Sequence, residues 1–128
     1  MQAHDFHLRG YQVLDFGATI VLDLVYDYAG QPKRERFFRF EGVELYHFFH
    51  TDGAIILDIE SVSVDAMLEE HRALIERSAA MNGVRGWRDG IEGYRTYLQS
   101  RDAKAWEVTS SIGFDGFAIA RAAGWVHA

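Results

Sequence analysis

The sequence predicts a single domain of the α+β class: a mainly antiparallel β-sheet with two helices packed on one face. Three features indicate this fold. Apolar residues alternate with a period of two in the first half of the chain, follow a helical spacing in the middle, and alternate again near the end. Strands joined by short turns pair antiparallel, and helices gathered in one block are typical of α+β proteins. A length of 128 residues supports one domain over residues 1–128.

The first half of the chain is typical of a series of strands. In residues 19–28, Ile20, Leu22 and Leu24 share one face, and Val21 and Asp23 share the other, as expected of a half-buried strand. Further strands are expected over residues 11–16, 34–41, 43–49 and 54–62. The Asp-Gly pair at residues 52–53 is typical of a tight turn between the strands expected over residues 43–49 and 54–62.

The spacing of apolar residues then changes to three and four. This predicts a helix over residues 64–78, with Ser63 or Asp65 as its N-cap, and a second helix over residues 84–98. Residues 106–112 alternate again, and residues 113–116 carry a turn signal. We therefore expect a C-terminal β-hairpin whose second strand runs over residues 117–121.

The chain is acidic, with 13 basic and 19 acidic residues and a net charge of −6. Residues 1–64 hold five of the basic and ten of the acidic side chains, so most of the excess lies in the strand-rich half. Binding to DNA or RNA depends on Lys and Arg neutralising phosphates, which makes a nucleic-acid partner unexpected. A basic protein is the electrostatically favoured partner.

Cysteine is absent, which excludes disulfides, thiolate metal sites and cysteine nucleophiles. The N-terminus shows no basic region followed by an apolar run, so we expect no secretory signal. No apolar stretch approaches the roughly 20 residues of a membrane helix. These features predict a cytoplasmic protein with no membrane partner.

Histidines supply the nearest approach to a metal-ligand motif. His47 and His50 lie three positions apart on an expected strand, where side chains of residues i and i+3 project from opposite faces. They would therefore point apart, and we expect no metal site and no cofactor.

His71 occupies the apolar stripe of the first expected helix. The favoured interpretation is a ring that hydrogen-bonds to the sheet or lies at the rim of the core. The alternative is the polar group of a pocket between sheet and helices, with Phe38, Phe40 or Tyr46 as walls. No catalytic residue is identified.

Asp58 and Glu60 share one face of an expected strand, about 7 Å apart. Paired carboxylates at such distances serve glycoside hydrolysis, but alternating acids are more typical of a solvated sheet face. Asp23 has the same position on the earlier long strand. We therefore take Asp23, Asp58 and Glu60 as a candidate face for binding a partner.

Two segments carry a resemblance: WEVTSSIGFDGFAIA at residues 106–120, and FRFEGVE at residues 38–44, after the long early strand. Both resemble patterns in small uncharacterised bacterial proteins, some of which are similar to immunity proteins of polymorphic toxin systems. The resemblance implies a cytoplasmic binding protein without catalysis, and it assigns a role to no residue.

The functional hypothesis is therefore a non-catalytic, acidic, immunity-like protein-binding module of a bacterial cytoplasm. One alternative is a small-molecule-binding protein or enzyme with a pocket around His71. Another is a structural homodimer formed through an exposed edge of the sheet.

Overall fold

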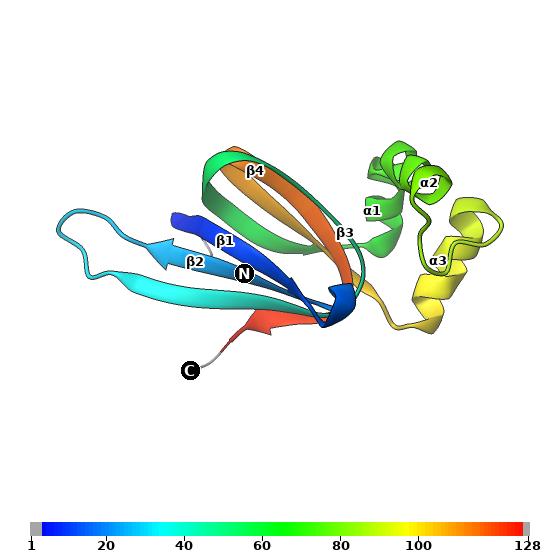
Figure 1. Cartoon of the computed structure of the whole chain (residues 1–128), viewed down its shortest axis with the longest axis horizontal. Helices are drawn as coiled ribbons and strands as arrows, with labels where there is room; N and C mark the ends of the chain where they lie inside the picture. The colour runs from blue at the N-terminus through cyan, green and yellow to red at the C-terminus, as the bar shows by residue number, and fades with distance from the viewer. Residues whose placement is uncertain (1–3, 127–128) are drawn as a thin grey trace.

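The computed structural model describes residues 4–126, apart from the side chain of Leu57. Residues 1–3, on which the expectation about a secretory signal partly depends, lie outside this range. In chain order the elements are β1 (Phe6–Leu14), the 3-10 turn η1 (Asp15–Gly17), β2 (Thr19–Tyr26), β3 (Arg34–Val62), α1 (Val64–Glu70), α2 (Arg72–Met81), α3 (Gly90–Ser100) and β4 (Lys104–Trp125). The helices lie together at one end of an antiparallel sheet, which confirms the α+β class (Figure 1).

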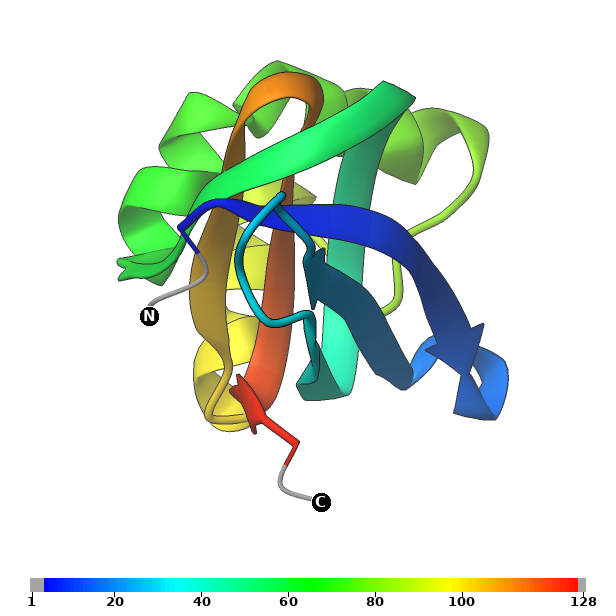
Figure 2. The same ribbon diagram turned by 90° about the vertical axis from the view of Figure 1, so that its left-hand side faces the viewer.

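The sheet curls until β1 meets β3. β2 pairs antiparallel with β1 on one side and with the start of β3 on the other. β1 also reaches a later part of β3, where Phe6 lies across from Ile56 and Leu8 from Ala54. β4 follows the opposite edge of β3 along most of its length. The backbone of the sheet is therefore strongly curled (Figure 2).

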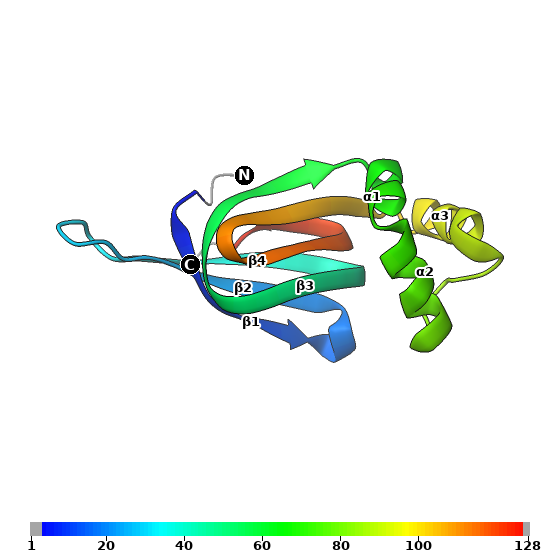
Figure 3. The ribbon, with the colours of Figure 1, turned by 90° about the horizontal axis from the view of Figure 1, so that it is seen from above.

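β3 and β4 form one long ribbon that bends back on itself (Figure 3). The ladder skips from His50 to Ile55 on β3, and opposite this bend β4 turns at Gly113 with φ 84°. A Cβ atom at Gly113 would lie 2.5 Å from the carbonyl oxygen of Gly53. Glycine is therefore needed at Gly113 both for the positive φ and for the close approach of the two strands.

The expected C-terminal hairpin is wrong. β4 is one continuous strand, and both of its halves pair with β3 instead of with each other. The turn signals at residues 52–53 and 113–116 mark bends in two strands that are already paired. Turn residues show where a chain changes direction, but they do not identify its hydrogen-bonding partner.

Apolar side chains form two cores, one on each side of the ribbon. The first fills the interior of the curled sheet and includes Ile20, Leu22 and Leu24, each 0% exposed. This confirms the alternation predicted for β2. The second lies between the helices and the outer face of the ribbon, where its buried members are Met67, Leu68, Ile75, Ile91, Tyr94, Leu98, Ala105, Phe117 and Ile119.

The first expected helix is divided into α1 and α2. Ser63, one of the two N-cap candidates, caps α1 by accepting a hydrogen bond from the backbone N–H of Ala66 at 3.1 Å. The helix breaks at His71, whose φ of −106° and ψ of 19° leave the helical region. The apolar residues keep their helical spacing across this break. The spacing therefore predicted one continuous helix over residues 64–78.

The second expected helix begins late, at Gly90 instead of at residue 84. Gly86 has φ 81°, and its backbone packs directly against the ring of Tyr97, so this segment forms a loop before α3. Three α-helices therefore replace the two expected over residues 4–126. None of the helices in this range is long and apolar enough to cross a membrane.

Candidate functional site

Asp23, the first residue of the expected partner-binding face, is held in an ion pair on β2. Arg9 of β1 donates to both of its carboxylate oxygens, from Nε at 3.1 Å and from Nη2 at 2.9 Å. Arg9 also reaches Glu35 at 3.3 Å, and this contact lowers the pKa of the Glu35 carboxyl. The charge of Asp23 is therefore already compensated within the chain.

Asp58 and Glu60 lie elsewhere, on the last part of β3. Asp58 lies across the ladder from Thr109, and its carboxylate accepts a hydrogen bond from the backbone N–H of Ile59 at 2.8 Å. Glu60 is exposed and lies directly across from Glu107 of β4. This part of β3 pairs with β1 and β4, whereas Asp23 lies on β2 across from the start of β3.

Glu60 belongs to a group of four carboxylates that we call the acidic cluster: Glu60, Glu70, Glu107 and Asp115. They come from β3, from the last residue of α1 and from two places on β4. Within residues 4–126, none of the four forms an ion pair with Lys or Arg. In this respect they differ from Asp23.

Glu107 is the half-buried member of the acidic cluster. Its pKa is raised above the ordinary value, first by burial, then by a hydrogen bond with Glu70 and by the charge of Glu70. Asp115 and Glu60 add to the repulsion. Like charges opposed at short range favour either a shared proton or a bound cation.

His71 lies beside these carboxylates, at the break between α1 and α2. Its ring stacks on Phe117 with 4.4 Å between ring centroids and 24° between planes. Phe117 is 1% exposed and belongs to the second core. The His71 ring is therefore half-buried at the rim of that core, over the outer face of β4.

The walls proposed for a pocket around His71 are not beside it. Phe38 and Phe40 are 0% exposed and fill the interior of the curled sheet, in the core that does not contain Phe117. Tyr46 is 37% exposed and contacts Phe48, which packs against the same interior core. These residues therefore do not enclose a pocket with His71.

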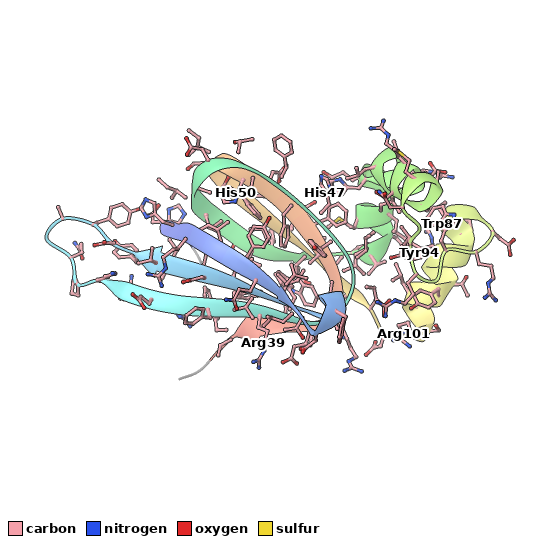
Figure 4. The ribbon with its side chains drawn as sticks, viewed as in Figure 1. Arg39, His47, His50, Trp87, Tyr94 and Arg101 are labelled. Atoms are coloured by element: carbon pink, nitrogen blue, oxygen red, sulfur yellow. The ribbon has the colours of Figure 1, made fainter. Side chains whose placement is uncertain are left out.

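His47 and His50 point in different directions, as strand geometry predicts. His47 lies on the helix side, with its ring 6.2 Å from that of Phe117, while His50 lies near the bend of the ribbon, 5.5 Å from Phe114 (Figure 4). They do not converge on a common point.

No protein family, curated protein or solved structure matches this chain.

Glu70, His71 and Glu107 are the described residues that can hold a metal ion together. One donor atom from each lies within 4.8 Å of the other two. Sequence reasoning assigned no role to Glu70 or Glu107, because Glu107 lies 36 positions after His71 and no local motif joins them. The sequence signal was limited to the adjacent Glu70 and His71, which lay inside the single helix expected over residues 64–78.

A second polar group lies at the other end of the helices. Glu44 of β3 accepts hydrogen bonds from the hydroxyl of Tyr97 at 2.9 Å and from Nε of Arg101 at 3.1 Å. Its side chain is only 5% exposed. An open cleft of about 320 Å³ beside it is lined by Gly42, Glu44, Ser100, Arg101 and Arg121. Because Tyr97 and Arg101 are both engaged by Glu44, this group links α3 to the sheet.

Proposed function

We propose that this protein is a non-catalytic binding module that docks a basic segment of a partner protein on the acidic cluster. The observation that carries the proposal is the set of four carboxylates without a basic partner in residues 4–126. In the immunity-like form of this proposal, suggested by the resemblance of residues 38–44 and 106–120, the partner is a basic toxin domain.

Charge complementarity supports a basic occupant. A Lys or Arg side chain placed between Glu70 and Glu107 replaces repulsion with attraction, and it can pair with carboxylates that have no basic partner among the described residues. The net charge of −6 adds a long-range attraction that speeds encounter at low salt. Asp23 contributes less, because Arg9 already neutralises it.

An exposed aromatic residue borders the acidic cluster. Phe49 is 62% exposed and lies directly across the ladder from Asp115. Aromatic side chains often act as anchors at interfaces, where charged pairs around them set specificity and association rate. The proposed partner segment therefore combines Lys or Arg with an apolar residue that covers Phe49.

Binding of a fluorescent oligolysine peptide tests the electrostatic part of the proposal. With EDTA present, fluorescence anisotropy measures affinity and its salt dependence for the wild type and for the double variant Glu60→Lys, Asp115→Lys. We expect the double variant to lose at least tenfold in affinity at low salt. The matched control is Asp27→Lys combined with Asp102→Lys, which changes charge equally at exposed positions away from the acidic cluster.

The same three proteins are then compared by native mass spectrometry of complexes isolated from the source cells. A basic protein retained by the wild type and the control, and lost by the Glu60→Lys, Asp115→Lys variant, is the expected result. Equal weakening of peptide binding by the double variant and its control would overturn the proposal, because net charge alone would then account for binding.

One observation favours a second candidate, the structural homodimer. Beyond Leu8, within residues 4–126, β1 pairs with β2 on one edge and with no strand on the other. At the end of this edge Leu14 is 43% exposed and Phe16 is 108% exposed. Unprotected strand edges with apolar side chains favour pairing with another strand.

Sedimentation velocity tests the homodimer. A wild-type dimer that the double variant Leu14→Lys, Phe16→Lys converts to a monomer would support it. Met81→Lys is the control, because Met81 is 74% exposed on α2, away from this edge. If the wild type is a monomer at high concentration, the homodimer proposal is rejected. The binding-module proposal does not depend on this result.

A further inference from the structure

Two carboxylates and one imidazole meet above the outer face of β4. Glu70 and Glu107 each offer a carboxylate oxygen and His71 a ring nitrogen, and these atoms lie within 4.8 Å of one another. An imidazole together with two carboxylates is a ligand set that metal sites use. The set is thus more than an accumulation of acidic side chains.

The fold itself brings these groups together. Neighbouring residues on a regular helix point about 100° apart, but α1 ends at Glu70, and His71 leaves helical geometry with φ −106°. Glu107 projects from the outer face of β4, across from Glu60. The helix break thus directs two consecutive side chains toward one strand residue.

The ring of His71 is also held in place. It stacks on Phe117 at 4.4 Å, and Phe117 is fixed in the second core with 1% exposure. A ligand whose orientation is set by packing loses little conformational freedom when it binds a metal. Glu70, by contrast, is exposed, and its flexible side chain can move the short distance that coordination needs.

The distances agree with a small divalent ion. Ligand bonds of about 2.1 Å in tetrahedral geometry place donor atoms about 3.4 Å apart. Donor atoms within 4.8 Å therefore close on an ion through small side-chain rotations. A 2+ charge also removes the repulsion between Glu70 and Glu107. The imidazole favours a transition ion over Mg²⁺ or Ca²⁺, which prefer oxygen ligands alone.

We propose that Glu70, His71 and Glu107 form a binding site for a divalent transition metal ion of the Zn²⁺ type. With three protein ligands, the ion keeps at least one position open to water or to another molecule. It also ties the corner between α1 and α2 to β4, so that metal binding stabilises the fold. This inference does not depend on the proposed function, because it needs no partner protein.

Isothermal titration calorimetry with zinc chloride tests the site, using the full chain after treatment with EDTA and removal of the chelator. We expect one Zn²⁺ to bind per chain. Thermal unfolding followed by circular dichroism should show a midpoint that rises when Zn²⁺ is added. Glu107→Gln and His71→Asn should each weaken Zn²⁺ binding at least tenfold. Magnesium chloride at the same concentration should leave the midpoint unchanged.

His47→Asn is the matched control. His47 contacts the same Phe117 ring, at 6.2 Å, but it is not one of the three donors. It should bind Zn²⁺ as the wild type does. Glu70→Gln provides a further ligand variant at an exposed position, in case either half-buried substitution disturbs folding as judged by circular dichroism.

The proposal is overturned if the wild type binds no stoichiometric Zn²⁺. It is also overturned if His47→Asn weakens binding as much as the ligand variants, or if Glu70→Gln binds Zn²⁺ unchanged. The peptide-binding experiment uses Glu60 and Asp115 with EDTA present. Loss of the metal site therefore leaves the docking proposal standing, and failure of docking leaves the metal site standing.

Discussion

Glu60 of β3 lies directly across the antiparallel ladder from Glu107 of β4, with Glu70 at the end of α1 beside them. Like charges directly opposite on a sheet destabilise it. The chain holds this arrangement with no basic side chain paired to these residues in residues 4–126. The metal ion or the basic partner proposed above would supply the positive charge that these carboxylates lack within residues 4–126.

Replacing Glu107 with Gln should stabilise the metal-free protein at neutral pH. The pKa of Glu107 is raised in the folded chain, mainly by burial and then by Glu70, so the native state favours the protonated carboxyl. Its stabilising contribution is complete below the ordinary pKa of 4.5 and is lost as the pH rises through the raised value. We expect Glu107→Gln to raise the free energy of unfolding at pH 7 by about 0.5 kcal/mol.

Urea unfolding in EDTA at pH 7 and pH 4 measures this effect, and the gain should shrink toward zero at the lower pH. Glu41→Gln is the control, because Glu41 pairs with Arg39 at 2.8 Å and its loss should not stabilise the chain. A Glu107→Gln protein that is less stable than the wild type at pH 7 would contradict the repulsion.

The local structure of several elements follows from the sequence alone. The alternation of Ile20, Leu22 and Leu24 predicted which face of β2 is buried, since side-chain period on a strand depends only on backbone geometry. Ser63 was one of two N-cap candidates, with Asp65, from its position before an apolar run. Both features depend on neighbouring residues.

The layout of the ribbon and the acidic cluster do not follow from local patterns. Gly113 marks a change of direction, but whether β4 pairs with itself or with β3 depends on residues more than 40 positions away. The same register places Glu107 across from Glu60. The break at His71 interrupts no apolar period, so the approach of Glu70 and His71 to Glu107 could not be predicted either.

Glu44 should be the main polar link between α3 and the sheet. Its nearly buried carboxylate accepts hydrogen bonds from Tyr97 and Arg101. Hydrogen bonds to charged groups contribute more than neutral ones. We expect Glu44→Ala to lower the free energy of unfolding by about 2 kcal/mol and Tyr97→Phe by about 1 kcal/mol, as measured by urea denaturation.

The double variant Glu44→Ala, Tyr97→Phe completes a thermodynamic cycle. If the two side chains interact, the double variant loses less unfolding free energy than the sum of the two single variants. The reason is that Tyr97→Phe removes no hydrogen bond once the Glu44 carboxylate is absent. Strict additivity would show that the hydrogen bond contributes nothing to stability.

Alkaline pH should weaken the same link. The pKa of Tyr97 lies above its ordinary value of 10, first because of burial and then because of its hydrogen bond to Glu44. The protonated phenol therefore stabilises the fold fully below pH 10, and this contribution is lost as the pH rises through the raised value. Above pH 10 the unfolding free energy of Tyr97→Phe should fall less steeply than that of the wild type. Parallel pH profiles would contradict this role of Tyr97.

The bend of the ribbon should tolerate no side chain at Gly113. Gly113→Ala places a Cβ atom 2.5 Å from the carbonyl oxygen of Gly53 and forces a non-glycine residue to hold φ 84°. Strained backbone of this kind costs about 1–3 kcal/mol before the clash is added. We therefore expect a loss of at least about 2 kcal/mol in urea unfolding. Gly10→Ala is the control, because nothing lies within 4 Å of a Cβ atom there and its φ is not positive. Equal unfolding free energies of Gly113→Ala and Gly10→Ala would contradict this prediction. They would show that β3 and β4 can move apart at the bend without loss of stability.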